Sequence, residues 1–174
     1  MLRRTGLSLP LAALLAFTLL PDRPVSAQTT AIADGIVGVW TLVSVTSQRD
    51  GGASGEPFGP NPQGIMIFTR DGHYSLFQSR GELPRLAASD RARATPEEAM
   101  AVLRDSIAYY GTYVVDEAAR YLSVTVSAST FANVIGPGQR RVITVLTPTA
   151  LEFSNPRTPS GLTLHTVWRR APSQ

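Results

Sequence analysis

The 174-residue sequence contains no cysteine and no lysine, and only two histidines. Without cysteine there can be no disulfide, no thiolate metal site and no cysteine nucleophile. The two histidines stand far apart, with no acidic partner at ligand spacing, so we expect no metal and no cofactor. A Gly-x-Ser-x-Gly elbow, a phosphate-binding loop and a dinucleotide fingerprint are also missing. Hydrolase chemistry is not supported, and stability must come from packing.

One long apolar run is present, at the start of the chain. It spans about 14 residues (7–20), follows Arg3 and Arg4, and precedes Val25 and Ala27 at the −3 and −1 positions of a cleavage site. This is the pattern of a secretory signal, and the run is shorter than the roughly 20 residues of a membrane-spanning helix. The alternative is an uncleaved anchor. We expect residues 1–27 to be removed, leaving an exported, periplasmic or secreted protein without a stable membrane anchor.

Cleavage changes the charge balance. The signal carries three basic residues and one acidic residue, so the mature chain keeps 13 basic and 12 acidic residues, a net charge of +1. A near-neutral domain lacks the clustered positive field on which nucleic-acid binding depends, and we expect no nucleic-acid partner. Residues 28–174 have the size of a single domain. The sequence leaves the oligomeric state open.

Short β-rich runs bounded by turn residues dominate the mature chain. Alternation of apolar and polar residues is clearest over residues 121–127. There Leu122, Val124 and Val126 lie on the opposite strand face from Tyr121, Ser123 and Thr125. The Asp71-Gly72 pair favours a hairpin. Eight runs are expected as strands, at 36–46, 64–69, 73–78, 109–116, 121–127, 139–147, 150–154 and 162–170. This pattern is typical of an all-β sandwich or barrel, and we predict a small antiparallel barrel.

Two segments interrupt the strands. Residues 47–63 are rich in Gly and Pro and are expected to form a long loop. Thr95, Pro96 and Glu98 predict a capped helix over residues 95–108. Met100, Leu103 and Ile107 recur at helical spacing and are expected to form an apolar stripe that packs on the barrel. These two segments are the candidates for covering the barrel mouth.

Several motifs, in their order along the chain, carry a family resemblance. Gly38-Val39-Trp40 looks like the Gly-x-Trp motif of lipocalins, and Trp168-Arg169-Arg170 looks like the basic segment that packs across that Trp. Further motifs are Pro57-Phe58-Gly59-Pro60-Asn61-Pro62, Tyr109-Tyr110-Gly111-Thr112-Tyr113, Phe131-Ala132-Asn133 and Gln139-Arg140-Arg141. Together they resemble the bacterial and fungal lipocalin-like domain proteins. The resemblance implies an up-and-down barrel of about eight or more strands, with one short helix, around a small apolar molecule.

The same resemblance suggests roles for the tryptophans. Trp40 and Trp168, with Arg169, are expected to form the barrel floor, where one of Arg169 and Arg170 stacks on Trp40 and the other is solvated. Tyr109 and Tyr113 share a strand face with Gly111 between them. They either contact a ligand or simply fill the barrel, and Gly111 either leaves room or marks a bulge.

The remaining candidates for ligand contact are Asn133, Arg140, Arg141 and His165. Arg140 and Arg141 point to opposite faces of a regular strand, so one faces inward unless a bulge turns both outward. An inward Arg suggests an acidic or carbonyl-bearing ligand or an internal carboxylate, since an unpaired buried charge is costly. Asn133 is either a turn residue or a polar contact. His165 is either structural or faces the lumen, where it can titrate near neutrality.

The sequence therefore predicts an exported lipocalin-like protein that binds a small hydrophobic or amphipathic molecule in a barrel lumen. One alternative is an isomerase, cyclase or lyase that uses the same pocket without a metal. Another is an envelope interaction protein whose barrel is filled by its own side chains. Lumen volume separates the last reading from the other two.

Overall fold

The computed structural model describes residues 31–49, 52, 54–156, 158 and 161–172. The predicted export signal, residues 1–27, lies outside them. Nine strands form one sheet that runs in the order β2-β1-β3-β4-β5-β6-β7-β8-β9, and β1 also pairs with β9. Every pairing is antiparallel. The sheet thus closes into an up-and-down barrel of eight strands with the short β2 outside it, as predicted.

The long strands lie close to the predicted runs. Their bounds are β1 (Gly38–Gln48), β3 (Gln63–Phe68), β4 (His73–Ser79), β5 (Ser106–Asp116), β6 (Tyr121–Ser129), β7 (Gly136–Leu146), β8 (Ala150–Asn155) and β9 (Thr163–Arg170). The two-residue β2 (Ser54–Gly55) interrupts the predicted 47–63 loop and pairs with the end of β1. Two single 3₁₀ turns, η1 (Arg91–Arg93) and η2 (Ala132–Val134), lie in the connections.

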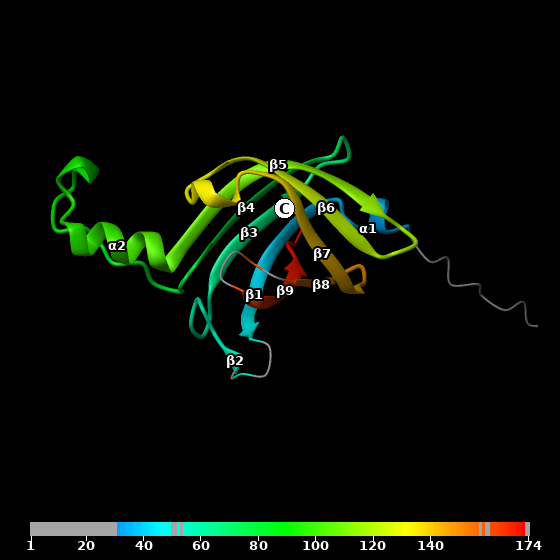
Figure 1. Cartoon of the computed structure of the whole chain (residues 1–174), viewed down its shortest axis with the longest axis horizontal. Helices are drawn as coiled ribbons and strands as arrows, with labels where there is room; N and C mark the ends of the chain where they lie inside the picture. Colours follow the sequence, from blue (N-terminus) through cyan, green and yellow to red (C-terminus); the bar gives the residue numbers. More distant parts are fainter. Residues whose placement is uncertain (1–30, 50–51, 53, 157, 159–160, 173–174) are drawn as a thin grey trace, which may run out of the picture.

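Helix α1 (Ile32–Ile36) was not predicted. It precedes β1 and buries Ile32 and Ile36. Its first backbone amides, those of Ile32 and Ala33, donate to the carboxylate of Glu117 at 2.9 and 2.8 Å. Glu117 follows β5, so this contact fastens α1 across one end of the barrel (Figure 1).

Helix α2 (Pro96–Asp105) has the predicted start but not the predicted packing. Thr95 and Glu98 form a capping box, and Pro96 occupies the first turn. The prediction that its apolar stripe packs on the barrel was wrong for Met100 and Leu103, which are 60% and 50% exposed. Ile107 does pack against the core, but as part of β5 and not of the helix. The helix ends before Ser106, where β5 begins, and it stands off the barrel at the end opposite α1 (Figure 1). None of the helices in the described part of the chain is long and apolar enough to cross a membrane.

The barrel interior is filled over only part of its length. The inward side chains of β1, β3, β6, β8 and β9 form one core in which Trp40, Phe68, Leu122, Phe153 and Trp168 are at most 2% exposed. Phe153 and Trp168 stack with ring centroids 6.4 Å apart. Toward α2 the inward positions carry more polar residues, and the core gives way to open space.

Candidate functional site

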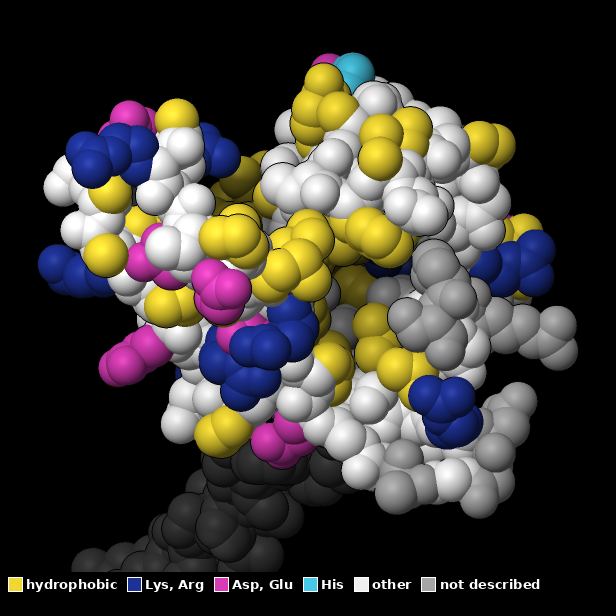
Figure 2. Space-filling view, turned by 60° about the vertical axis from the view of Figure 1, so that its left-hand side comes forward, with side chains coloured by type: hydrophobic (Ala, Val, Ile, Leu, Met, Phe, Trp, Pro, Cys, Tyr) yellow, Lys and Arg dark blue, Asp and Glu magenta, His cyan; other side chains and the backbone are white. Residues whose placement is uncertain are grey.

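A cavity of about 780 Å³ opens at the α2 end of the barrel. Its wall is mainly apolar and includes Ile107 of β5, Leu164 of β9 and the buried Phe58. Phe131 and Ile135, which are 40% and 49% exposed, also line it. Figure 2, which looks toward this end, shows apolar side chains gathered around a hollow with basic side chains beside it. The volume suits a small molecule, since ligand pockets commonly span about 300–1,000 Å³.

Arg141 forms part of the inner wall of this cavity. The register of β6 with β7 is regular where it pairs Leu122 with Arg141 and Ser123 with Arg140, and it shifts only between Val124 and Val126. Arg141 therefore faces inward, and only 1% of it is exposed. Its Nη2 donates to the hydroxyl of Tyr109 at 2.7 Å and to Oε1 of Gln139 at 3.2 Å. A longer contact of 3.4 Å reaches the hydroxyl of Tyr74. Its Nε and Nη1 are buried and have no acceptor in the described part of the chain.

Two phenols, those of Tyr74 and Tyr109, lie beside Arg141. Burial raises the pKa of Tyr74 well above its ordinary value, so this hydroxyl keeps its proton. Tyr74 packs edge-on against Tyr109, with ring centroids 5.8 Å apart, and the guanidinium carbon of Arg141 lies 5.4 and 5.7 Å from the two ring centroids. These aromatic faces attract the cation but do not neutralise it.

Among the residues that the structure describes, no carboxylate pairs with Arg141. Among the described residues that line the cavity there is no Asp, Glu or His, and none of the ion pairs in the described part of the chain involves Arg141. A guanidinium stays protonated under all ordinary conditions, so its charge cannot be shed. The barrel therefore holds a buried positive charge whose hydrogen bonds go only to neutral acceptors.

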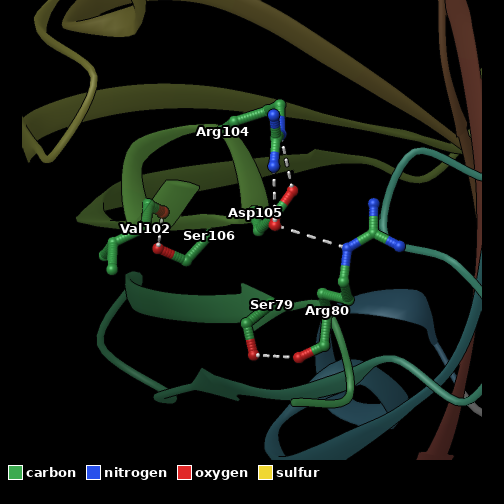
Figure 3. Close-up of polar contacts among 6 residues, drawn as sticks. All are labelled: Ser79, Arg80, Val102, Arg104, Asp105 and Ser106. Carbon is green, nitrogen blue, oxygen red and sulfur yellow. Dashed lines mark hydrogen bonds and ion pairs between the residues drawn. The ribbon is translucent and has the colours of Figure 1, made fainter. Parts of the chain in front are cut away.

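An ionic contact stabilises the chain beside the cavity mouth, where α2 meets β5. Asp105 is buried, and its carboxylate accepts from Arg104 at 3.1 Å and lies 3.5 Å from Nε of Arg80 (Figure 3). The hydrogen bond from Arg104, aided by Arg80, lowers the pKa of Asp105. Because Arg80 directly follows β4, this contact ties the end of α2 to the neighbouring strand end.

The opposite end of the barrel is sealed by Trp40 and Arg170. Arg170 stacks on the Trp40 ring at 4.1 Å and donates to the carbonyl oxygens of Pro148, Val37 and Gly35 at 2.6, 2.8 and 2.6 Å. Gly38 makes room for it, because a Cβ at this positive-φ position would lie 2.6 Å from Nη1 of Arg170.

Comparison with known protein families identifies the family of this chain. Residues 37–171 match the model of a family described as a lipocalin-like domain. The chain belongs to this family. A search of curated proteins found no match. The family assignment agrees with the predicted resemblance and with the closed barrel, and it supports small-molecule binding in general without naming a ligand.

Within this lipocalin-like barrel, the predicted contact residues divide between three places. Tyr109, Arg141 and Asn133, the last on η2, line the cavity. Arg140 also reaches the cavity rim, but its guanidinium lies over the Tyr121 ring at 4.2 Å, and the residue is exposed. His165 is exposed on the outer face of β9 and does not line the cavity, since the inward positions are Leu164 and Thr166.

Tyr113 shares the inward face with Tyr109, as expected, but belongs to the closed half. Its hydroxyl donates to the carbonyl oxygen of Thr69 at 2.7 Å, and its ring packs edge-on against Phe68. Gly111 leaves no space for a ligand, because a Cβ there would come within 1.9 Å of the carbonyl oxygen of Thr125. The glycine marks a close backbone approach beside a bulge.

The predicted floor holds Trp40 and Trp168 but not Arg169. Both tryptophans are buried, whereas Arg169 is exposed, and Arg170 takes the stacking position. Strand alternation explains the correction, because Trp168 and Arg170 share the inward face of β9 and Arg169 lies between them on the outer face.

The polar residues of the cavity that were missed include Gln78, Gln139 and Asn155. Alternation was the signal that could have found them. Gln139 precedes Arg141 by two residues, Gln78 continues the inward series of Tyr74 and Leu76, and Asn155 continues that of Leu151 and Phe153. Oδ1 of Asn155 is buried without a partner.

Proposed function

We propose that this protein is an exported lipocalin-like carrier that binds a small hydrophobic or amphipathic molecule in the cavity at the α2 end of its barrel. The observation that carries the proposal is the unequal filling of the barrel. One half is closed by Trp40 and Arg170 and packed with large side chains, whereas the other half opens into a half-open cavity of about 780 Å³. A barrel with no ligand would gain stability by filling that space.

The chemistry of the wall favours binding over turnover. The side chains that line the cavity offer a phenol at Tyr109 and a cation at Arg141, but the described lining residues include no Asp, Glu or His to serve as a general base. The enzyme alternative assigned acid–base work to Tyr109, Tyr113, an inward Arg and His165, and of these Tyr113 and His165 do not line the cavity. An apolar wall with a few convergent polar groups is the usual composition of a site that binds a small molecule.

Native mass spectrometry of the protein from its own host tests export and binding together. The chain should be recovered from the extracytoplasmic fraction with a mass that starts at Gln28, because Val25 and Ala27 form the predicted cleavage site. It should also retain a small molecule that is released on denaturation. Recovery of a chain that keeps Met1 contradicts the export prediction, and a bare mass under gentle conditions contradicts the carrier.

A second test fills the cavity. Leu164→Trp should abolish binding of a fluorescent apolar probe such as N-phenylnaphthylamine, because the indole would occupy space that the probe needs. Val114→Trp is the matched control, since Val114 is 70% exposed on the barrel exterior. Equal probe binding by wild type and both variants would place the apolar site elsewhere.

A further inference from the structure

We propose that the ligand is an amphipathic carboxylic acid that enters head-first, with its carboxylate on the hydroxyl of Tyr109 and the charge of Arg141 behind it. This inference rests on the proposed function, since it names the chemical class that the same cavity takes. Three features of the described residues support it: the unbalanced charge, the free proton of Tyr109 and the division of the cavity wall.

The first feature is the cost of Arg141. Burying a cation without a carboxylate opposes folding, and in Arg141 two of the three guanidinium nitrogens lack any acceptor. A position that served only to fill the barrel would do better with an aliphatic side chain of similar volume. An anion brought by a ligand removes the imbalance, and it does so only in the bound state.

The second feature is the direction of the hydrogen bond to Tyr109. The Tyr109 oxygen accepts from Nη2 of Arg141 at 2.7 Å, so its own proton remains available to another acceptor. A hydroxyl that accepts from a cation becomes a stronger donor, because linked hydrogen bonds polarise each other. Both residues line the cavity, but Tyr109 is partly exposed whereas only 1% of Arg141 is exposed. The Tyr109 hydroxyl thus connects Arg141 to the ligand through two linked hydrogen bonds.

The third feature is the arrangement of the wall. Tyr109, Gln139 and Arg141 form one hydrogen-bonded polar group on β5 and β7. Leu162, Leu164 and Ile107 supply apolar wall, and the polar Gln78 and Asn155 are paired beside Ile107 and Leu164 on the neighbouring strands. A molecule with one acidic end and a mainly apolar body that also accepts or donates a few hydrogen bonds matches this wall. Most of its affinity would come from the apolar body, and the acid would set its orientation.

Calorimetric titration of the mature chain with decanoic acid and with methyl decanoate tests the head group. The two probes share the apolar body and differ in charge, so wild type should bind the acid at least about tenfold more tightly, the lower range for a charge-assisted hydrogen bond. Arg141→Met and Tyr109→Phe should each remove most of this preference while leaving the affinity for the ester within about twofold.

Two controls match these variants. Arg169→Met removes the same charge from an exposed site on β9, and Tyr113→Phe removes a phenol whose hydroxyl is bonded to Thr69 in the closed half. Both should keep the preference for the acid. Arg141→Lys, which keeps the charge, guards against a folding defect in Arg141→Met and should retain part of the preference.

The outcomes separate this inference from the proposed function. A preference for the acid that disappears in Arg141→Met and Tyr109→Phe supports the inference. If wild type binds acid and ester equally, the head-group inference is overturned while binding in the cavity stands. If neither probe binds any of the proteins, and the fluorescent probe also fails, both proposals are overturned.

Discussion

The two ends of the barrel each hold an inward-facing arginine, and the surroundings of the two side chains differ. At the closed end every nitrogen of the Arg170 guanidinium donates to a backbone carbonyl, and the ring of Trp40 lies against its face. In the cavity wall, Arg141 uses only Nη2, and its acceptors are side-chain oxygens of neutral residues.

This difference distinguishes an arginine that stabilises the fold from one for which we propose an anionic ligand as partner. Arg170 satisfies carbonyl groups that would otherwise be left without donors where α1 meets β1, so it strengthens the fold. Arg141 adds a buried charge that the fold does not balance, so it weakens the ligand-free barrel. The contacts at the closed end stabilise the fold. At the open end the buried charge destabilises the ligand-free fold but belongs to the proposed binding site.

The largest effect should come from Trp40, which anchors the closed end. Trp40 is fully buried, and its Nε1 donates to the carbonyl oxygen of Ile36 at 2.8 Å. Trp40→Ala should lower the free energy of unfolding by about 3–5 kcal/mol, as expected for truncation of a buried aromatic. Urea denaturation monitored by circular dichroism measures it. An unchanged midpoint would show that the closed end is not the stable half.

Arg170→Met should have a smaller effect of the same sign. It leaves the carbonyl groups of Gly35, Val37 and Pro148 without their donor, and we expect a loss of about 2–3 kcal/mol. Arg169→Met, one residue away on the exposed face of β9, should change stability by less than about 0.5 kcal/mol. Equal losses in the two variants would contradict the distinction between the stacked and the solvated arginine.

Sequence patterns predicted the fold well because alternation and turn residues are local signals. They located eight barrel strands within a few residues and the capping box at Thr95. They misplaced the end of α2. In the sequence Ile107 continues the helical spacing of Met100 and Leu103, but in the structure it belongs to β5. Where the chain leaves a helix to join a neighbouring strand depends on pairing with β4, which local spacing does not contain.

The site was harder to predict than the fold. On β7 the two alternating sets, Gln139-Arg141-Ile143 and Arg140-Val142-Thr144, are both mixed in polarity, so the sequence could not show which arginine faces inward. On β9 alternation did carry the signal. Residues two apart share a strand face, so if Trp168 faces inward, Arg170 does so as well. Tyr113 shows a further limit: alternation gives its face but not the end of the barrel at which it lies.

The most direct test of the central claim compares the unfolding of wild type and Arg141→Met with and without decanoic acid. Without the acid, Arg141→Met should be at least as stable as wild type, with a gain of about 1 kcal/mol from removing an unbalanced buried charge. With the acid at roughly 100 times its dissociation constant for wild type, wild type should gain about 2.7 kcal/mol and Arg141→Met much less. A loss of several kcal/mol in ligand-free Arg141→Met, together with equal stabilisation of both proteins by the acid, would contradict the claim and make Arg141 a structural residue like Arg170.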